Sequence, residues 1–424
     1  MGIEESRATP FVILIAPNVS ERMGGEAIKA LQIYQSLVDR GVEVHQVTHS
    51  RVRDEITANF PEMKASYVED DRLDVFLAKS KALEFFSTPY FMWRAAKVAR
   101  ELAREHPGAV VHVTSPISPV APTFPVPGTP VVIGPLNGNI HHPRPFRDRE
   151  SPKDRIRRTW LVPSQRLHRL FFSGKQTADV LLVAGGERTA ESLRIAGCRD
   201  AQFRPTLDSG LPDKIRHEPL IEHSGPNFRF VQHGRLVPYK GADLSIKALA
   251  RTRNPATLDI IGQGAFQEHL EKLVAELKLG DRVRFFGWTP HDKLLKDLRQ
   301  YRAFVFPTLA EANGIVVQEA MMLGLPTICV DWGGPAELIT PETGILLPPS
   351  DEESVVAGLA AAMDKLGEDG ELAARMAEAG RRAALERGFT WPDLIEQWIA
   401  IYRELRPPTA TAPAHAGGHP AATA

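Results

Sequence analysis

Short apolar runs alternate with helix-period segments along the whole chain. In the first half, apolar runs of strand length stand at 10–17, 42–49, 109–114, 129–134 and 179–184, and in the second half at 227–234, 257–262, 282–287, 303–308 and 326–331. Segments with a helical spacing of apolar residues separate most of them, for example 27–41 and 90–106. Alternating strands and helices are typical of βα units in a parallel sheet. The pattern predicts an α/β protein with two Rossmann-like, doubly wound parallel-sheet domains.

The alternation stops once and then restarts, which indicates two domains. At 424 residues the chain exceeds the size at which one core keeps growing. A polar stretch with Pro and Gly lies at 206–226 and is predicted to be the hinge. We expect a first domain at 1–205, a second at 227–390, a last helix at 391–406 and a disordered, low-complexity tail at 407–424. Two such sheets facing each other form a cleft at the carboxyl ends of their strands.

Composition limits the classes of protein that the chain can represent. Hydrophobic residues make up 43% and charged residues 24%, as in ordinary soluble domains. No apolar run reaches the roughly 18 residues that span a bilayer, and the first apolar run is too short and wrongly flanked for a signal peptide. We therefore expect a cytoplasmic protein. Its two cysteines, Cys198 and Cys329, lack metal-ligand spacing and are predicted to be structural thiols.

Two glutamates flank a predicted helix start in the segment FVFPTLAEANGIVVQEAMMLG. The strand ends near Pro307, Glu311 lies in the loop, the helix begins around Gly314, and Glu319 lies in its second turn. A helix N-terminus offers free N–H groups and partial positive charge, which suit phosphate or sugar oxygens. The alternative is that both glutamates are solvated residues at a helix end.

Two cations lie on one loop in the segment FRFVQHGRLVPYKGADLSIKAL. Arg235 and Lys240 follow a strand and precede a helix. Such a pair can neutralise a diphosphate whose charge grows as a glycosidic bond breaks. A solvated pair of surface cations is the alternative for this segment taken alone.

Together the two segments resemble the E-x7-E and G-R-x4-K-G motifs of the retaining glycosyltransferases of family 4, which have the GT-B fold. The resemblance implies that Glu311 holds hydroxyls of the donor sugar and that Glu319 holds the nucleoside ribose. It places the backbone of Gly314 and Ile315 near sugar and phosphate. The chain departs from the family at Asn313, where a large apolar residue is frequent. The second motif is matched by Gly234, Arg235, Lys240 and Gly241.

Further segments match the family less specifically. The loop from Met23 to Glu26 contains Gly24 and Gly25 and resembles a glycine loop near the donor phosphates, although a plain tight turn explains it equally well. Gly287 and Trp288 stand where the family receives the base. Gly333 and Gly334 match a phosphate-side turn, and the last helix resembles one that crosses back to the first domain.

The acceptor side of the chain is less informative. His112 and Thr114 occupy the two positions of an H-x-H pattern found in some relatives, and Asn137 lies in GPLNGN, which resembles a loop of a bacterial branch. These three are candidate acceptor contacts; a buried, satisfied histidine and a turn asparagine are the alternatives. The charge run EDDRLD at 69–74 lacks a supporting strand, so we predict no metal site there.

Residues 153–172 interleave six basic residues with large apolar ones. Such a mixture can lie on an anionic membrane surface. A pair of helices packing its apolar side into the first domain is the alternative.

The sequence thus predicts an enzyme that transfers a hexose-type sugar from a UDP- or GDP-sugar with retention, in the synthesis of exopolysaccharide, lipid-linked glycan or glycolipid. The acceptor is a lipid-linked saccharide or glycan, and the enzyme is peripheral on the inner face of the membrane. No metal, cofactor or nucleic-acid partner is expected, because Arg235, Lys240 and the helix N-terminus can replace a cation. The alternatives are a soluble acceptor, a nucleotide-sugar epimerase or hydrolase, and a binding protein without catalysis; the first domain offers no convincing carboxylate pair for the epimerase or hydrolase.

Overall fold

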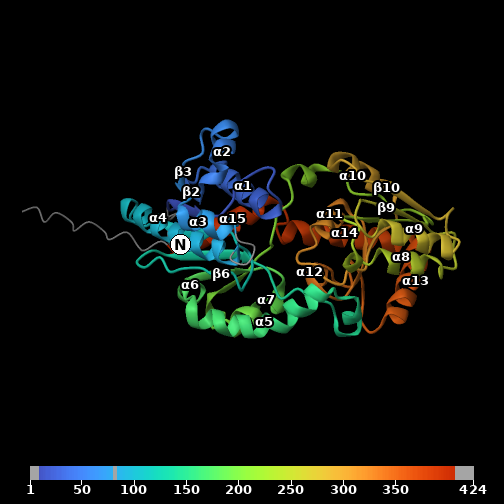
Figure 1. Cartoon of the computed structure of the whole chain (residues 1–424). Helices are drawn as coiled ribbons and strands as arrows, with labels where there is room; N and C mark the ends of the chain where they lie inside the picture. The colour runs from blue at the N-terminus through green and yellow to red at the C-terminus, as the bar shows by residue number, and fades with distance from the viewer. Residues whose placement is uncertain (1–8, 80–83, 406–424) are drawn as a thin grey trace, which may run out of the picture.

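The computed structural model describes residues 9–79 and 84–405, which form two α/β domains (Figure 1). The first-domain sheet has seven strands in the order β3-β2-β1-β4-β5-β6-β7, all paired in parallel. They are β1 (Val12–Ile15), β2 (Val44–His49), β3 (Ala65–Val68), β4 (Val110–Val113), β5 (Val131–Leu136), β6 (Val180–Val183) and β7 (Phe203–Pro205). The helices of this half are α1 (Gly25–Val38), α2 (Arg53–Asn59), α3 (Arg72–Lys79), α4 (Ser87–Glu105), α5 (Pro152–Phe171), α6 (Gly174–Thr177) and α7 (Gly186–Ile195).

The second-domain sheet has six parallel strands in the order β10-β9-β8-β11-β12-β13. They are β8 (Arg229–His233), β9 (Thr257–Ile261), β10 (Val283–Gly287), β11 (Ala303–Phe306), β12 (Thr327–Val330) and β13 (Gly344–Leu347). The helices of the second half of the chain are α8 (Ala242–Leu249), α9 (Gln267–Glu276), α10 (His291–Asp297), α11 (Ile315–Leu323), α12 (Gly333–Leu338), α13 (Glu352–Glu368), α14 (Gly370–Glu386) and α15 (Trp391–Leu405). Short 3-10 helices are η1 (Ser50–Val52), η2 (Glu84–Phe86), η3 (Arg144–Arg149), η4 (Asp200–Gln202), η5 (Asp213–His217), η6 (Pro238–Lys240) and η7 (Leu298–Gln300). The predicted fold of two doubly wound parallel-sheet domains is confirmed.

Both sheets reverse their strand order at one point, next to their first strand. The reversal lies between β1 and β4 in the first sheet and between β8 and β11 in the second. Because the helices leaving the two neighbouring strands go to opposite faces of the sheet, a crevice opens at the strands' carboxyl ends, where ligands bind in such folds. The loops after β8 and β11 are those that contain Arg235, Lys240 and Glu311.

The last helix completes the core of the first domain. Trp398 and Tyr402 of α15 are almost completely buried, and they pack in one cluster with Val12 and Leu14 of β1. The Tyr402 hydroxyl also lies 2.7 Å from Nδ1 of His112 on β4. The chain therefore passes between the domains twice, once after β7 and once before α15.

The two crossings lie side by side. The Leu211 N–H donates to the Phe389 carbonyl at 2.7 Å, and the Trp391 N–H donates to the Leu211 carbonyl at 2.9 Å. On the first-domain side, Lys29 of α1 donates to the Asp208 carboxylate at 2.6 Å in a buried ion pair. The crossing is thus a paired, anchored segment rather than a single loose linker.

Several sequence expectations need correction or lie outside the described residues. The apolar pattern missed β3, β7 and β13, each of which has three or four residues. The charge run at 69–74 does follow a strand, because β3 ends at Val68. The predicted tail at 407–424 lies outside the described residues. No helix within 9–79 and 84–405 is long and apolar enough to cross a membrane.

Candidate active site in the cleft between the domains

In the second domain, hydrogen bonds to a backbone carbonyl join the loop after β8 to the loop after β11. The Tyr239 carbonyl accepts from the Leu309 N–H at 2.7 Å and from the Thr308 hydroxyl at 3.1 Å. Between this loop and α8, Gly241 has φ +69°, and a Cβ there would lie 2.2 Å from the Pro307 carbonyl oxygen. Only glycine fits this close approach, which explains why Lys240 is followed by Gly241.

This junction brings Lys240 and Glu311 together. Lys240 Nζ donates to Glu311 Oε2 in an ion pair, and each side chain is 17% exposed. The second carboxylate oxygen, Oε1, accepts from the Ala312 N–H at 3.2 Å. The Glu311 carbonyl accepts from the Gly334 N–H at 2.9 Å, so the start of α12 also anchors the backbone of the Glu311 loop. Glu311 is therefore fixed at the switch point of the second sheet with a cation beside it.

Arg235 lies on the same loop as Lys240 but has different partners. Its side chain is exposed, and Nη2 donates to the Tyr239 hydroxyl at 2.8 Å. Among the described residues Arg235 makes no ion pair with a carboxylate. One cation of the loop is thus held by Glu311, and the other is open to an anionic ligand.

Glu319 projects from α11 and forms a second polar pair, with His291. Its Oε1 lies 2.7 Å from His291 Nε2, and the hydrogen bond to the carboxylate raises the pKa of His291. His233, at the end of β8, is buried with Nε2 unpaired among the described residues. Burial lowers the pKa of His233 to about 4, with Glu319 acting in the opposite direction, so its ring is neutral near pH 7. The sequence analysis singled out neither histidine, although His233 directly precedes the cation motif that begins at Gly234.

The start of α11 matches the prediction made from its sequence. Gly314 caps the helix in the left-handed region with φ +76°, and Gly324 ends it with φ +79°. Ile315 is 39% exposed at the first position of the helix. Asn313 is turned toward its own helix, because Gln318 Nε2 donates to its Oδ1 at 3.2 Å.

The remaining donor-side candidates lie further out. Gly287 ends β10, and its carbonyl accepts from the Gly262 N–H at 2.8 Å. Trp288 follows with 70% of its surface exposed. In the first domain Gly24 caps α1 and Gly25 begins it. No described hydrogen bond or ion pair joins the Gly24–Gly25 turn to the second domain.

The three acceptor-side candidates are buried. His112 is fully buried, its Nδ1 bonded to Tyr402 and its Nε2 lying 2.8 Å from the Gly134 carbonyl. The alternative of a satisfied core histidine therefore describes His112. Burial lowers its pKa to about 4. Thr114 is also buried and donates to the Ile15 carbonyl at 3.3 Å.

Asn137 contacts the other domain rather than open space. Its Nδ2 donates to the Ala312 carbonyl at 3.2 Å, next to Glu311. Arg188 of α7 donates to the Asn137 side-chain oxygen at 2.8 Å and also to the Ala312 carbonyl. Two first-domain side chains thus hold the backbone of the Glu311 loop. Arg188 had no motif around it and could not be singled out from sequence.

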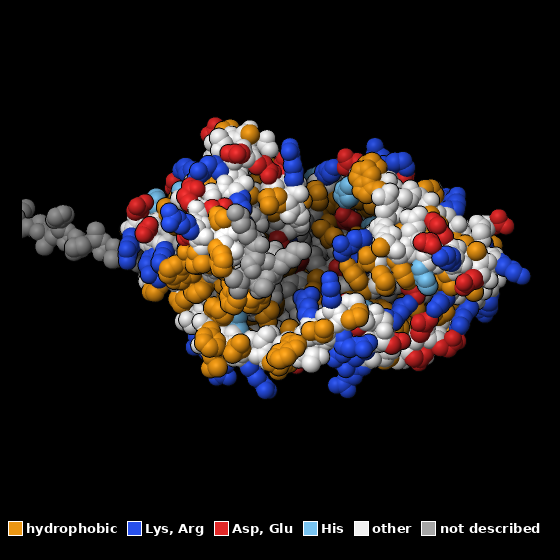
Figure 2. All heavy atoms as spheres, in the orientation of Figure 1, with side chains coloured by type: hydrophobic (Ala, Val, Ile, Leu, Met, Phe, Trp, Pro, Cys, Tyr) orange, Lys and Arg blue, Asp and Glu red, His pale blue; other side chains and the backbone are white. Residues whose placement is uncertain are grey.

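Two further contacts span the cleft beyond this point. Trp332 Nε1 donates to the His141 carbonyl at 2.8 Å, and Arg149 pairs with the buried Asp243 of α8. The segment after β5 therefore touches the second domain at several places. The space-filling view shows the molecule hollowed between the two domains (Figure 2).

Two cavities lie on either side of residues 139–141, and Glu311 lines both. One, which we call the α5 cavity, has a volume of about 280 Å³ and reaches α5; the other, of about 390 Å³, reaches α7 and α12. The α5 cavity is lined by Asn139, Ile140, His141, His142, Glu150, Asp154, Arg157, Arg158, Leu161, Tyr239, Ala310, Glu311 and Ala312. Glu150 and Asp154 place first-domain carboxylates in the cleft, which the sequence did not reveal.

Helix α5 is continuous and presents its apolar side chains to solvent. Ile156, Trp160, Leu167, Leu170 and Phe171 are each 58% exposed or more. The alternative of a helix pair packed into the first domain is therefore wrong, since the buried side chains of α5 are Gln165 and His168. Figure 2 shows hydrophobic side chains along the lower edge, where α5 runs in Figure 1, with Lys and Arg side chains beside them.

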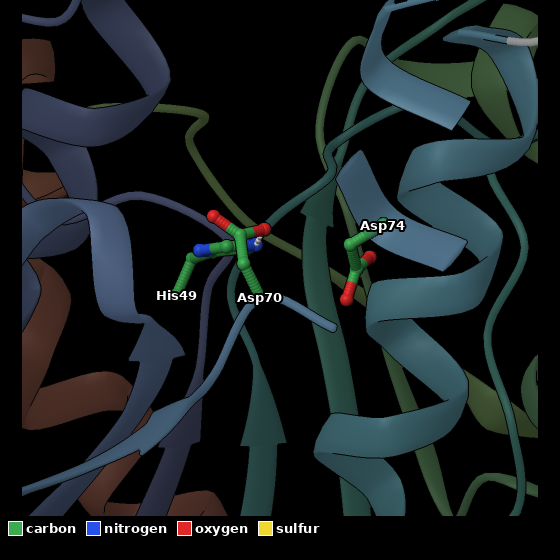
Figure 3. A group of neighbouring side chains, drawn as sticks. All are labelled: His49, Asp70 and Asp74. Atoms are coloured by element: carbon green, nitrogen blue, oxygen red, sulfur yellow. Dashed lines mark ion pairs between the residues drawn. The ribbon is translucent and has the colours of Figure 1, made fainter. Parts of the chain in front are cut away.

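His49, Asp70 and Asp74 form a group at the carboxyl end of β2 and β3 (Figure 3). His49 Nε2 lies 3.3 Å from Asp70, which also pairs with Arg51 at 2.8 Å. Asp74 pairs with Arg94 at 2.6 Å. Because each carboxylate already has an arginine partner, we assign no metal to this group.

Comparison with known proteins finds a match to one family model within the second half of the chain. Residues 215–383 match Glycosyl transferases group 1. The alpha-D-kanosaminyltransferase of Streptomyces kanamyceticus is 28% identical over 258 residues, 60% of this chain and 58% of that protein. The GDP-mannose-dependent monoacylated alpha-(1-6)-phosphatidylinositol monomannoside mannosyltransferase of Corynebacterium glutamicum is 31% identical over 179 residues, 40% of this chain and 45% of that protein. The chain thus spans about half the length of these curated relatives.

Solved structures support the fold over nearly the whole chain. The Anabaena protein HepE in complex with UDP and glucose superposes with a TM-score of 0.57 at 17% identity, covering 92% of this chain and 98% of that one. At this identity the likeness shows the GT-B architecture and nothing about the ligand.

Proposed function

We propose that the protein is a glycosyltransferase that moves a hexose-type sugar from a UDP- or GDP-sugar to an acceptor with retention of configuration. The observation that supports this most is the Lys240–Glu311 pair at the switch point of a Glycosyl transferases group 1 domain. Arg235 lies beside the pair and can bind a phosphate. Glu319 can accept hydrogen bonds from ribose hydroxyls once its hydrogen bond to His291 is broken. The crystal structure of HepE, a protein of the same fold, in complex with UDP and glucose agrees with a nucleotide-sugar donor.

In this proposal charge stabilisation comes from the chain itself. Arg235 and Lys240 bind the diphosphate as its negative charge grows, and the N–H groups at the start of α11 add a partial positive charge. Glu311 orients the sugar ring through its hydroxyls. No metal ion or cofactor is required.

Retention requires either a covalent sugar–enzyme intermediate or attack from the face that the phosphate leaves. A covalent route needs a carboxylate beneath the anomeric carbon, as in glycosidases that use a nucleophile. Glu311 is already paired with Lys240 and bonded to the Ala312 N–H, which lowers its nucleophilicity. We therefore propose front-face attack, with the departing diphosphate accepting the proton of the acceptor hydroxyl.

The setting that fits α5 is the surface of an anionic membrane. Its exposed apolar side chains and cations can lie at the lipid headgroups, and this favours exopolysaccharide, lipid-linked glycan or glycolipid synthesis at the inner face of the cytoplasmic membrane. A soluble acceptor is the alternative in which α5 has another partner.

A panel of UDP-, GDP- and ADP-sugars tests the proposed function. The cognate donor at about 100 times its dissociation constant stabilises the fold by about 2.7 kcal/mol, which a thermal-shift assay detects. That donor is then incubated with lipid extracts and with soluble saccharides, and the product's anomeric configuration is read by NMR. Protein that is stabilised by no nucleotide sugar and transfers none contradicts the proposal.

An epimerase or hydrolase is the second candidate, and one observation favours it. Glu150 and Asp154 of the first domain share a cavity with Glu311, so carboxylates for general acid–base chemistry are present in the cleft. Incubation with the donor alone separates the two functions. Release of free sugar or of an epimer, at the rate seen with acceptor present, supports the second candidate.

A further inference from the structure

The α5 cavity connects the proposed donor site with the start of α5. One wall comes from residues 139–142 and the first turns of α5, and the other from Tyr239 and Glu311 of the second domain. A molecule in this cavity contacts both domains and lies beside the carboxylate assigned to the donor sugar. The position suits a second substrate rather than the nucleotide.

His142 is a buried polar side chain without a partner in this cavity. It is 5% exposed, and its Nε2 has no hydrogen-bond partner among the described residues. A buried polar atom left unpaired costs about 1–3 kcal/mol. A ligand hydroxyl can pair with it in either direction, because a neutral imidazole both donates and accepts.

Arg158 of α5 lines the same cavity as His142. Its Nε donates to both oxygens of Glu150, at 3.1 and 3.0 Å, and the Glu150 side chain is 1% exposed. The pair fixes the guanidinium while its two Nη atoms have no partner among the described residues. Arg157 lies beside it on α5 and is exposed. A fixed guanidinium with free N–H groups is suited to phosphate.

We propose that the α5 cavity is the acceptor subsite and that the acceptor is a phosphorylated saccharide, with His142 binding a sugar hydroxyl and Arg158 the phosphate. This inference rests on the proposed function, because it names the second substrate of that reaction. The phosphate can belong to a free sugar phosphate or to a lipid-linked sugar phosphate, which share this chemistry. The saccharide then points toward Glu311, and the phosphate lies toward α5.

Binding to the nucleotide-saturated protein tests the proposal. The protein is saturated with UDP or GDP, whichever binds, so that the donor phosphate positions are filled. Glucose 1-phosphate, dodecyl glucosyl phosphate in micelles and neutral methyl glucoside are then titrated by calorimetry. We expect both phosphorylated probes to bind more tightly than methyl glucoside. A preference for the dodecyl compound assigns the lipid-linked source, and equal binding assigns the soluble one.

Variants connect this binding to the two residues. His142→Ala lowers the affinity for glucose 1-phosphate at least tenfold, and His142→Gln, which keeps a hydrogen-bonding group, recovers part of it. Arg158→Gln alone leaves the Glu150 carboxylate buried without a partner, so the double variant Glu150→Gln with Arg158→Gln is used to remove the preference for phosphate. His217→Ala is the control, because that histidine is exposed on η5.

The outcomes distinguish this inference from the function on which it rests. Nucleotide affinity stays at the wild-type value in every variant, because His142 and Arg158 make no described hydrogen bond or ion pair with the Arg235–Lys240 loop. Wild-type protein that binds nucleotide but neither phosphorylated probe overturns the acceptor subsite alone. Unchanged probe affinity in His142→Ala and in the double variant does the same. Protein that binds no nucleotide overturns the proposed function and this inference with it.

Discussion

The two sides of the cleft differ in how their functional groups are assembled. On the second-domain side, Arg235, Lys240 and Glu311 come from two loops that follow adjacent strands, and backbone hydrogen bonds join those loops. On the first-domain side, the groups that reach the cleft come from the segment after β5, from α5 and from α7. A site built from switch-point loops is encoded in short motifs, whereas one built from long excursions is encoded in tertiary packing.

Removing either Arg235 or Lys240 should produce the largest effect on turnover, because these cations are the proposed diphosphate-binding groups of the second domain. Lys240→Ala or Arg235→Ala is expected to reduce turnover about 100- to 1,000-fold, through loss of a preorganised donor to developing charge. Lys247→Ala is the matched control, since Lys247 pairs with Glu352 on the same domain away from the cleft. Steady-state kinetics with the cognate donor measures the change. More than half of the wild-type rate in either variant would mean that the cation assignment is wrong.

Glu311→Gln should reduce transfer by a smaller factor, and it tests the role of the charge in the Lys240–Glu311 ion pair. The amide still hydrogen-bonds a sugar hydroxyl but loses the charge, so transfer is expected to fall about 10- to 100-fold and remain measurable. Product formation is followed by chromatography, with intact-protein mass spectrometry in parallel. Complete loss of transfer together with a glycosyl adduct on wild-type Glu311 would establish the covalent route instead.

The cations of α5 test whether the first-domain side faces a membrane. Replacing Lys153, Arg155 and Arg157 with Ser should reduce co-sedimentation with anionic liposomes at least about tenfold at low salt, because each cation near the surface contributes about 1 kcal/mol. High salt should imitate the change. Arg158 is left in place, since it pairs with the buried Glu150.

A variant with three exposed second-domain cations replaced by Ser is the control for α5. Lys272, Lys293 and Arg375 serve, because each side chain is 65% exposed or more. Equal losses in both triple variants would indicate a general charge effect. Wild-type protein that never sediments with liposomes would favour a soluble acceptor.

The smallest effect concerns His291 and pH. Its pKa is raised by the Glu319 carboxylate, so the imidazolium–carboxylate pair is present below that raised pKa and is lost as the pH rises through it. A ribose that needs Glu319 must displace the pair, and nucleotide affinity is therefore expected to be about threefold weaker at pH 6 than at pH 8. Isothermal titration at both pH values measures this. His291→Ala should remove the pH dependence, and an unchanged dependence in that variant would assign it to the nucleotide's own phosphate.

Much of the fold could be predicted from local pattern. Apolar runs such as VILI and TICV mark central strands that are buried on both faces, and the Lys-Gly and Gly-Ile boundaries mark the starts of α8 and α11. Short edge strands such as β3 and β7 were missed, because three or four partly polar residues give no periodicity. Their pairing is decided by the neighbouring strand.

The site residues also fall into two groups, those that local motifs predict and those that only the packing reveals. The Lys240–Glu311 contact joins the two motifs that the sequence analysis singled out, and the donor-side assignments stay predictions. His112 occupies a strand position that sequence alone cannot distinguish from a cleft position, and only the packing of α15 shows that it is covered. His142 and Arg158 meet in one cavity because of the course of residues 139–152, which no local spacing records.

The position of α15 has a consequence for how the protein is made. Trp398 and Tyr402, which close the core over β1, are synthesised almost 400 residues after that strand. The second domain takes its core from residues as far as Phe389, directly before α15, whereas the first domain has all its strands by Pro205 and keeps an uncovered apolar face until α15 emerges from the ribosome. A stalled or truncated product lacking α15 would therefore present that face to chaperones and proteases. Cellular quality control would then detect the loss of the last helix by the apolar surface that it leaves exposed on the first domain.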